Sequence, residues 1–423
     1  MDIFERIRAN MGPLGQYADI AEGYYIFPKL TGEIGSRMMF NGKEVICWSI
    51  NNYLGLANHP EVRKVDAEAS AEWGLAYPMG ARLMTGETDQ HIQLEKELAA
   101  FVRKEAGCLL NYGYQGMTSC IDSLVSRRDV IVYDAESHGC IIDGVRLHLG
   151  KRIAFEHNNI ESFEKQLVRA VKMAEEGGGS VLVVTEGVFG MRGDQGKLKE
   201  IAAFKSKYPF RLLVDDAHGF GTLGPNGEGA GVEQGVQDEI DIYFGTFAKS
   251  MASIGAFIAG PPDIVKFLKY NMRSQVFAKT LPQPLVIGAL KRLELIRTTP
   301  SLKQQLWKNV NALQNGLRDA GFEIGISNTP VTPVFLKGHP KEASQLVMDL
   351  RENHHIFCTM VIYPIIPKGE IILRLIPTAV HTQEDIDVTL AAFKAVSGKL
   401  QRGEYRAEVV NPLLQQEAAG GVS

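Results

Sequence analysis

Short apolar runs alternate with amphipathic stretches of helical length between residues 60 and 275, and this alternation constrains the fold most strongly. The runs are rich in Val, Ile and Leu and carry few charges, which is typical of strands covered on both faces of a sheet. Examples are VIVYD (130–134), SVLVVTEGVF (180–189) and RLLVDDAHG (211–219). Strands that alternate with helices form a mostly parallel sheet, so the pattern predicts an α/β fold.

The length of the chain indicates more than one folding unit, because 423 residues exceed the usual size of a single compact core. Beyond residue 282, two long helical patterns lead into strand-like runs such as IFCTMVIYPIIP and a final helix. We expect the N-terminal segment to pack against this second domain or against a partner subunit. The predicted parts are an N-terminal segment (1–55), a large α/β domain (56–282), a small α+β domain (283–405) and a flexible tail (406–423).

Charge and cysteine content exclude several classes of protein. The net charge of −4 comes from intermixed acidic and basic residues, so no basic face for nucleic acid is expected. Five cysteines lie far apart without a C-x-x-C pair, which is typical of free thiols. The N-terminus lacks the apolar core of a signal peptide, and no apolar run reaches the roughly 18 residues of a membrane-spanning helix. We therefore expect a cytoplasmic protein without a transmembrane segment.

One motif matches a dinucleotide-binding pattern. GFGTLG (219–224) has the G-x-G-x-x-G spacing and follows a strand-like run. A dinucleotide site needs a helix that begins inside the motif, but the next residues, PNGEGAGVEQG, contain too much Gly and Pro to begin one well. We interpret the glycines as a tight turn beside a site and keep a nucleotide-binding module as an alternative.

Four segments carry candidate site residues, and each is expected at the end of a strand, where open α/β sheets bind ligands. NYGYQG (111–116) would open a helix whose free amides suit a phosphate, or it is a plain turn. DAESHGCIIDG (134–144) places His138 at the start of a helix. That histidine would stack on an aromatic ligand or simply cap the helix.

The third segment, VDDAHG (214–219), places Asp215 and His218 three residues apart across a turn. Such a pair would address two edges of one planar heterocycle. A carboxylate beside a pyridine nitrogen keeps that nitrogen protonated, which makes the ring an electron sink. A capping role for the acid is the alternative.

The fourth segment, GTFAKSMASIGAFIAG (245–260), contains a single lysine, Lys249, among small and apolar residues. A lysine in a dry site loses its proton near neutral pH and forms a Schiff base with an aldehyde. Thr246 lies three residues earlier, where its hydroxyl would bind a phosphate. A phosphate cradle, a stacking histidine, a carboxylate, a second histidine and a lysine together indicate pyridoxal phosphate.

These segments resemble the α-oxoamine synthases, a family of fold-type I pyridoxal phosphate enzymes that includes serine palmitoyltransferase. The resemblance covers roughly residues 20 to 400. Within the family, the sequence most resembles the soluble bacterial serine palmitoyltransferases. The motifs that carry it are NNYLGLANHPEV, GARLMTGETDQHIQLEKELAAF, SHGCIIDGVR, VDDAHGFGTLG, GTFAKSMASIGAFIAG and LRLIPTAVHT.

The resemblance implies roles for the residues that contact the cofactor. Lys249 would form the Schiff base, and His138 would stack on the ring and position the substrate carboxylate. Asp215 would face the pyridine nitrogen, and His218 would face the phenolic oxygen. The residues that would bind phosphate and ring are Gly113, Tyr114 and Thr246, together with Thr280, which would reach the phosphate of a neighbouring subunit.

The resemblance also implies a substrate site. Arg374 in LRLIP would bind the α-carboxylate of an amino acid through a bidentate pair. Asn52 in NNYLGL and Arg82 in GAR (80–82) would lie near the bound substrate.

Several positions depart from the pattern of the family. Relatives usually read GSR, HAS, FSMEGD and FSAS where this chain has GAR, HGC, FGMRGD and FAKT. Serine hydroxyls are lost, and two cations, Arg192 and Lys279, are gained near motifs that line the site. Drift outside the site is one interpretation. The other is a changed substrate, because two extra cations suit an amino acid with a second negative charge, such as cysteate.

The resemblance implies the decarboxylative condensation of a small α-amino acid with an acyl thioester to give a 3-keto amine. The amino acid would be serine, cysteate or glycine, and the donor a long-chain acyl-CoA or acyl-carrier protein, in sphingolipid or sulfonolipid synthesis. The resemblance also implies a homodimer with shared active sites. Because the substrates would be lipid-like, loose association of the enzyme with the inner membrane surface is a further expectation.

Three alternatives to this activity stay open. One is glycine C-acetyltransferase (2-amino-3-ketobutyrate CoA ligase), and another is an aminotransferase on the same fold. The third is a non-catalytic partner subunit of the family, but such subunits have lost the lysine that Lys249 matches.

Overall fold

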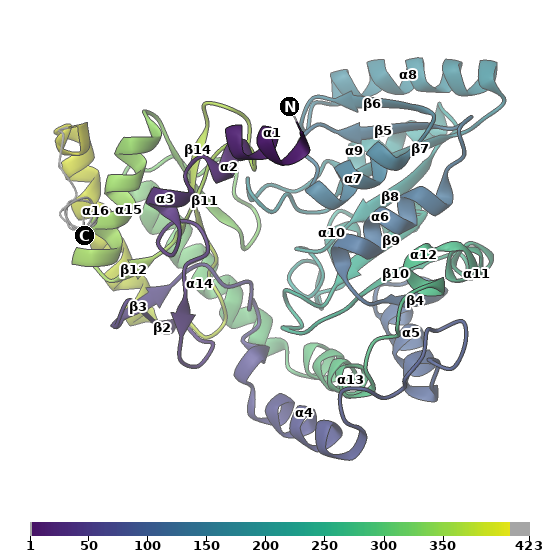
Figure 1. Cartoon of the computed structure of the whole chain (residues 1–423), viewed down its shortest axis with the longest axis horizontal. Coiled ribbons are helices and arrows are strands. Elements are labelled where there is room, and N and C mark those ends of the chain that lie inside the picture. The colour runs from purple at the N-terminus through teal and green to yellow at the C-terminus, as the bar shows by residue number, and fades with distance from the viewer. Residues whose placement is uncertain (1, 407–423) are drawn as a thin grey trace.

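A computed structural model of the protein describes residues 2–406. Its larger lobe is built on a seven-stranded sheet, drawn in teal to green on the right of Figure 1. The strand order is β4-β10-β9-β8-β7-β5-β6, and only β10 runs antiparallel to its neighbours. The strands are β4 (Ala106–Leu110), β5 (Val130–Asp134), β6 (Lys151–Phe155), β7 (Val181–Glu186), β8 (Arg211–Asp215), β9 (Ile242–Thr246) and β10 (Ala256–Gly260).

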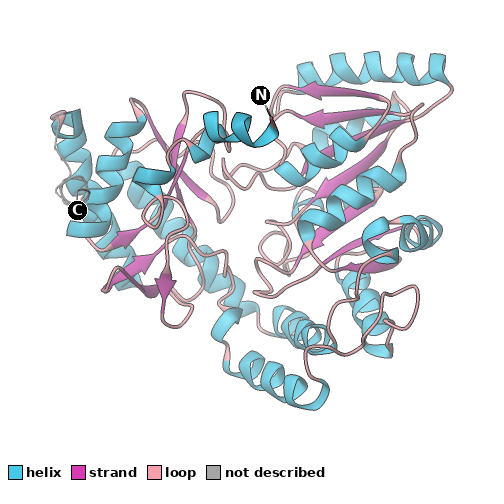
Figure 2. Ribbon diagram, viewed as in Figure 1, coloured by secondary structure: helices cyan, strands magenta, loops and turns pink. Residues whose placement is uncertain are grey.

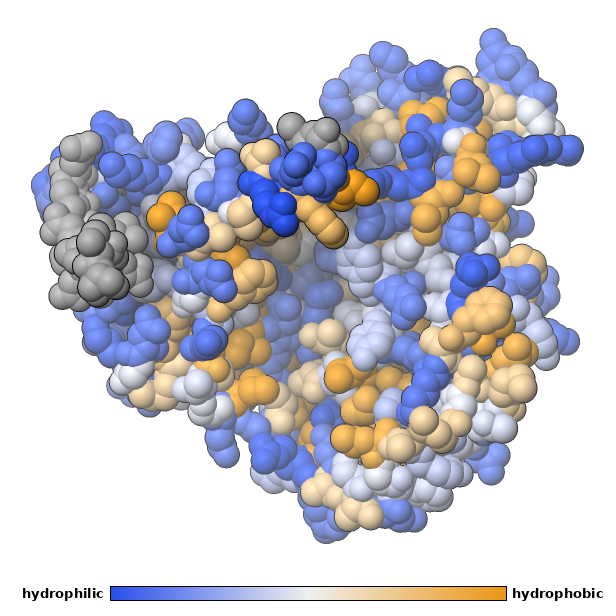
Figure 3. Space-filling view, in the orientation of Figure 1, coloured by the Kyte–Doolittle hydropathy of each residue, from blue (hydrophilic) through white to orange (hydrophobic). Residues whose placement is uncertain are grey.

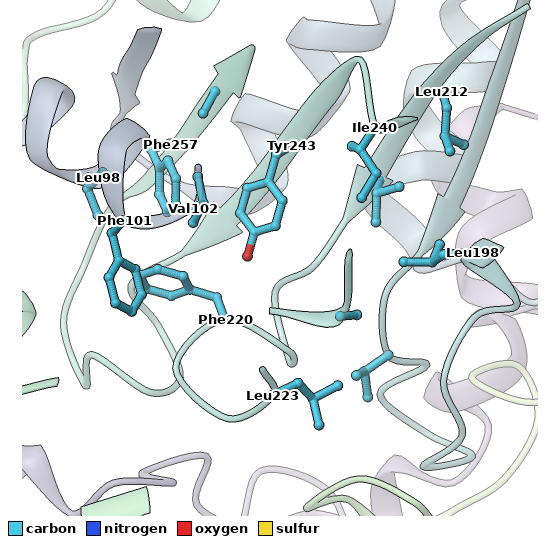
Figure 4. Packing of buried hydrophobic residues seen from close by; sticks show 14 of the residues in the cluster. Leu98, Phe101, Val102, Leu198, Leu212, Phe220, Leu223, Ile240, Tyr243 and Phe257 are labelled. Atoms are coloured by element: carbon cyan, nitrogen blue, oxygen red, sulfur yellow. The ribbon is translucent and has the colours of Figure 1, made fainter. Parts of the chain in front are cut away.

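Helices cover both faces of this sheet because successive strand residues point to opposite sides. In β7, Val183 packs in the core with Phe163 of α8, whereas Val184 packs with Met117 of α6. Figure 4 shows part of the first core, where the aromatic rings of the sheet and its covering segments meet. The helices of this lobe are α4 (Pro60–Trp73), α5 (Asp89–Phe101), α6 (Gly113–Leu124), α7 (Gly139–Leu147), α8 (Ile160–Gly177), α9 (Leu198–Ala203), α10 (Ala230–Glu233), α11 (Pro262–Asn271), α12 (Arg273–Val276) and α13 (Gln283–Thr298).

The smaller lobe holds an antiparallel sheet of order β11-β14-β13 flanked by helices (Figure 2). A separate apolar core, which includes Leu313, Leu350, Leu373 and Phe393, stabilises it. Its elements are α14 (Pro300–Asp319), β11 (Thr332–Leu336), α15 (Pro340–Asn353), β12 (Ile356–Phe357), β13 (Thr359–Val361), β14 (Ile371–Leu375) and α16 (Gln383–Gln401).

The N-terminal segment joins the smaller lobe through a shared sheet. Strand β3 pairs in parallel with β12, so that Ile46 lies opposite Ile356. The guanidinium of Arg351 on α15 lies 5.1 Å from the ring centre of Tyr24, which ties the segment to the same lobe. Its elements are α1 (Ile3–Ala9), α2 (Gly12–Gly15), α3 (Ala18–Ala21), β1 (Leu30–Thr31), β2 (Arg37–Phe40) and β3 (Lys43–Cys47).

The α/β fold with a mostly parallel sheet and a smaller second sheet confirms the fold class predicted from the alternating pattern. The exact division at residues 55 and 282 stays a prediction, and residues 407–423 of the predicted tail lie outside the described part of the chain. No helix within residues 2–406 is long and apolar enough to cross a membrane. The five cysteines are free and buried.

Candidate active site

A cavity of about 890 Å³ lies where the carboxyl ends of the parallel strands face the smaller lobe. The hollow between the lobes is visible near the centre of Figure 3. Strands β5, β7, β8 and β9 run in the same direction, so the loops that follow them meet at this edge. Residues 363–367 and Arg374 line the cavity from the smaller lobe. The sheet thus gathers at one place most of the side chains that the sequence singles out.

Lys249 lines the cavity from the loop that follows β9. Its side chain is surrounded by protein, and burial lowers the pKa of the ammonium group. The carboxylate of Asp215 opposes this shift, whereas the charge of Arg374 adds to it. A lysine whose pKa is lowered is more often neutral, and a neutral amine is the nucleophile that binds an aldehyde.

Asp215 ends β8 and is buried at the floor of the cavity. One carboxylate oxygen accepts a hydrogen bond from the backbone N–H of Ala217 (3.0 Å), and Cys140 Sγ lies 3.8 Å from the other. Burial raises the pKa of this carboxyl, while Lys249 and His138 oppose the rise. A bound pyridinium would supply the positive partner that this buried acid lacks.

Glu186 is a site residue that the sequence reasoning missed. It ends β7 opposite Asp215 in the sheet, and its carboxylate accepts the backbone N–H of His138. Burial and the neighbouring Asp215 raise the pKa of Glu186 well above its usual range. The signal in the sequence was its place as the last polar residue of the apolar run SVLVVTE.

His138 is the N-cap of α7, and its side chain also lines the cavity, so the capping and the cofactor interpretations describe one geometry. Its Nδ1 accepts a hydrogen bond from the backbone N–H of Cys140 (3.3 Å). Burial lowers the pKa of the imidazole, against the pull of Asp215. A neutral ring that accepts at Nδ1 carries its proton on Nε2, which leaves an N–H donor for a ligand.

His218 is held from behind by Tyr53, whose hydroxyl lies 2.7 Å from Nδ1. Burial, with the charges of Lys249 and Arg374, lowers the pKa of His218 well below its ordinary value. The loop after β7 approaches closely, because a Cβ added at Gly190 would lie 2.3 Å from His218 Nε2. Gly190 therefore leaves this imidazole the space that a side chain would take.

Helix α6 supplies the place for a phosphate. The side chain of the N-cap residue, Tyr112, accepts no hydrogen bond from the first turn of the helix. The backbone N–H groups of that turn are therefore without a side-chain acceptor. A Cβ added at Gly113 would lie 3.1 Å from Thr246 Oγ1, which shows how closely helix and hydroxyl approach. Tyr114 also lines the cavity and donates its hydroxyl to Asp143. Uncapped amides, a hydroxyl, a buried acid and a lysine of lowered pKa fit pyridoxal phosphate.

Arg374 is the clearest anion-binding group of the cavity. The guanidinium is buried, donates from Nε to the carbonyl oxygen of Gly190 (2.6 Å) and from Nη2 to Asn51 Oδ1 (3.2 Å). No carboxylate within residues 2–406 forms an ion pair with it. A buried cation without a counter-charge favours binding of a substrate carboxylate.

The prediction for Asn52 needs a correction, because its neighbour Asn51 is the residue that contacts Arg374. The side chain of Asn52 is buried and accepts a hydrogen bond from the backbone N–H of Ala57 (3.1 Å). The segment is neither helix nor strand, so no periodicity in the sequence told which of the two amides faces the cavity.

Two predicted substrate residues, Arg82 and Lys279, are not among the residues that line the cavity. Arg82 is buried between Glu87 (2.6 Å) and Glu95 (2.9 Å), so its charge is already matched. Lys279 is exposed on the segment that precedes α13, and its backbone forms an isolated antiparallel β-bridge with Ala81. Thr280 lies beside it, with its hydroxyl 3.3 Å from His91 Nε2.

Arg192 does line the cavity, but it is not a free cation. Its guanidinium binds Glu136, with Nη2 2.9 Å from Oε1, and Glu370, with Nη2 2.8 Å from Oε2. The sequence left open whether this cation binds substrate or reflects drift outside the site, and the structure pairs it with two carboxylates.

The motif at 219–224 forms turns, and the next helix, α10, begins only at Ala230. No helix N-terminus therefore faces a dinucleotide here, as the Gly- and Pro-rich sequence after the motif predicts.

Comparisons with known proteins identify the family of the chain. The family model described as aminotransferase class I and II matches residues 43–393. A cysteate-C-fatty acyltransferase of Capnocytophaga ochracea is 66% identical over 98% of this chain and 99% of that protein. The chain belongs to the α-oxoamine synthases of this family. The resemblance seen in the motifs is thereby confirmed, and pyridoxal phosphate is the cofactor.

More distant relatives show the range of this family. A serine palmitoyltransferase of Sphingobacterium spiritivorum is 34% identical over 86% of this chain and 89% of that protein. An 8-amino-7-oxononanoate synthase of Thermoanaerobacter pseudethanolicus is 35% identical over 89% of this chain and 94% of its own. A solved serine palmitoyltransferase from S. paucimobilis with a bound PLP–myriocin aldimine superimposes with a TM-score of 0.86 at 27% identity, covering 95% of this chain and 99% of that one. The chain is thus a pyridoxal phosphate-dependent enzyme that condenses an amino acid with an acyl thioester.

Proposed function

We propose that the amino acid substrate is cysteate and that the acyl donor carries a long chain. The observation that carries this proposal is the 66% identity, over nearly the whole chain, to a protein named cysteate-C-fatty acyltransferase. The product would be a 3-keto amine that retains the sulfonate, a precursor of a sulfonolipid. The absence of a membrane-spanning helix in residues 2–406 fits an enzyme that works in the cytoplasm, with loose contact to the inner membrane surface when it takes up lipid-like substrate.

In this proposal Arg374 binds the α-carboxylate and fixes the amino acid above the floor of the cavity. Asn51 and the carbonyl of Gly190 orient the guanidinium, so its remaining N–H groups are available to the substrate. The lowered pKa of Arg374, which burial causes, indicates that the site favours an anion beside it.

Pyridoxal phosphate supplies the electron sink that lets the amino acid lose its α-proton. Asp215 would hold the proton of the ring nitrogen, and His218, whose Nδ1 lies 2.7 Å from the Tyr53 hydroxyl, would face the phenolic oxygen. Lys249 takes the α-proton, because its lowered pKa leaves the amine able to act as a base.

The condensation then forms a bond between Cα and the thioester carbonyl carbon. The carbonyl C–S bond breaks to release the thiolate, which takes up the proton that Lys249 removed, and the α-carboxylate departs as carbon dioxide. Cα then takes up a proton from solvent, which gives the 3-keto amine. His138, with a proton on Nε2, donates to the thioester oxygen as negative charge develops there.

The active unit in this proposal is a homodimer. Large apolar side chains are exposed on one region of the surface around Thr280, and such a patch is typical of an interface. Backbone contacts join its segments, since Thr280 N donates to Gly80 O (2.9 Å). The exposed residues are Leu75, Tyr77, Met79, Leu83, Met84, Tyr112, Tyr270 and Phe277. Thr280 would then reach the phosphate of the partner subunit, as the family pattern implies.

Product analysis tests the substrate assignment. The enzyme loaded with pyridoxal phosphate is incubated with palmitoyl-CoA or palmitoyl-carrier protein and with cysteate, serine or glycine in separate reactions. The proposal expects carbon dioxide and a sulfonated 3-keto amine with cysteate and at least tenfold slower turnover with the other two. Equal or faster turnover with serine would reassign the enzyme as a serine palmitoyltransferase.

A further inference from the structure

Arg192 joins three parts of the chain at the mouth of the cavity. It lies on the loop after β7, Glu136 lies on the loop after β5, and Glu370 directly precedes β14 of the smaller lobe. Nη2 contacts both oxygens of Glu370, at 2.9 and 2.8 Å. The three side chains are half-buried, so solvent only partly screens their interaction.

The guanidinium uses its two partners differently. Nε and Nη2 form one edge, and that edge binds the two oxygens of Glu136 in a bidentate pair. Both oxygens of Glu370 contact Arg192 Nη2, which Glu136 also contacts, and Glu370 contacts no other nitrogen of this guanidinium. One positive charge faces two negative charges, so the two carboxylates repel each other. Glu136 binds a full edge of the guanidinium and is the anchor, whereas Glu370 is held through Nη2 alone.

Glu370 ends the segment 362–370, of which residues 363–367 form an apolar wall of the cavity. Beneath this segment, Val361, Ile366 and Ile372 form a small core against which Met191 and Phe335 pack. The Arg192 guanidinium lies 5.9 Å from the centre of the Phe335 ring. The Arg192–Glu370 ion pair and the small apolar core thus connect the larger lobe to the smaller lobe at the same place.

We propose that Arg192 and Glu370 form a clamp, anchored by Glu136, that positions the wall 363–367 for the acyl chain of the thioester. Arg192 is a positioning residue in this reaction rather than a counter-ion for the amino acid. The inference rests on the acyl-transfer activity of the family and not on the choice of cysteate.

Hydrogen exchange of the enzyme loaded with pyridoxal phosphate tests the clamp without any substrate. Glu370→Gln and Arg192→Met each release the contact, so exchange in a peptide covering 362–370 is expected to accelerate at least fivefold. The double variant is expected to exchange no faster than the faster single variant, because both remove one interaction. Lys368→Gln is the matched control, since this exposed lysine of the same segment forms no ion pair within residues 2–406.

Binding and kinetics separate the clamp from a role in amino acid binding. Each single variant is expected to raise KM for the acyl thioester about fivefold while the Kd for the amino acid stays within twofold of wild type. Unchanged exchange in 362–370, or additive effects in the double variant, would overturn the clamp. So would a tenfold weaker amino acid affinity in Arg192→Met that Glu370→Gln does not share, because that pattern identifies a counter-ion.

Discussion

Two adjacent asparagines have different partners, and the difference is testable. Asn51 orients Arg374, whereas Asn52 accepts a backbone N–H from Ala57. Asn51→Ala is expected to raise the Kd for the amino acid roughly tenfold, because a hydrogen bond to a charged group contributes about 1.5–3 kcal/mol. Asn52→Ala is expected to leave that Kd within about twofold and to lower the free energy of unfolding by about 1 kcal/mol. Spectroscopic titration and urea unfolding of both variants check this, and the reverse assignment of effects would contradict the geometry.

Asp215 and Glu186 form a second matched pair, opposite each other at the ends of β8 and β7. We expect Asp215→Asn to lower kcat about 10²–10³-fold, since an amide cannot hold the proton on the ring nitrogen. Burial and Asp215 raise the pKa of Glu186, which favours its neutral form, and Gln keeps an oxygen that accepts the backbone N–H of His138. Glu186→Gln is therefore expected to lower kcat less than about threefold, on the scale of a retained neutral hydrogen bond. Steady-state kinetics of the two variants measure the contrast, and equal losses would show that Glu186 is charged.

Sequence was a good guide to residues that directly follow strands. Lys249, Asp215 and His138 meet in the cavity because parallel strands deliver their carboxyl ends to one edge. Asn51 and Tyr53 were not foreseen because they lie in an irregular segment, where side-chain direction depends on tertiary packing. The sequence singled out Arg192 but not its pairing, since the two carboxylates that bind it lie 56 and 178 residues away in the chain.

At the scale of elements, a charged histidine ties together two of the loops that carry the site. His157 lies between Asp134 at the end of β5 and Asp194 on the loop after β7, at 3.1 and 3.0 Å. Burial disfavours the charged ring, but hydrogen bonds to the two carboxylates outweigh it and raise the pKa to about 10. The loops that hold His138 and Gly190 are thus fixed by an ion cluster that no local pattern predicts.

This raised pKa predicts a pH-dependent stability. A group whose pKa is higher in the folded state stabilises the fold fully below its unfolded value, near 6.5, and loses that effect as the pH rises through about 10. His157→Gln should therefore cost roughly 2 kcal/mol or more of unfolding free energy at pH 6 and much less at pH 10. Urea unfolding of wild type and variant at both pH values measures the difference. A cost that does not change with pH would show that His157 is neutral.

The arrangement of the two lobes places the site between a large sheet and a small one, and the comparisons confirm the fold that the alternating pattern predicted. The sequence predicted this architecture because burial on both faces leaves a strong apolar signal in the inner strands of the larger sheet, such as β7 and β9. The short strand β12 pairs with β3 more than 300 residues earlier, and a pairing at that separation leaves no local signal.

The proposed homodimer is a prediction at the scale of the whole molecule. Met79 is 77% exposed within the apolar surface, and a charge buried there without a partner weakens association. Met79→Asp is expected to raise the dimer Kd at least about tenfold and to lower activity per chain at low concentration. Leu149→Asp, at an exposed residue before β6 on the other edge of the sheet, is the control. Sedimentation velocity would contradict the proposal if wild type stays monomeric or if both variants behave alike.

The most direct test of the central claim is an absorbance titration of the purified protein with cysteate, serine and glycine in turn. The account predicts a yellow protein whose absorbance band requires Lys249 and shifts with cysteate at concentrations at least tenfold below those needed for serine or glycine. Arg374→Met is expected to remove the response to cysteate while the protein keeps its colour. A colourless protein that does not bind added pyridoxal phosphate would contradict the account of the site, and an equal response to serine would contradict the substrate.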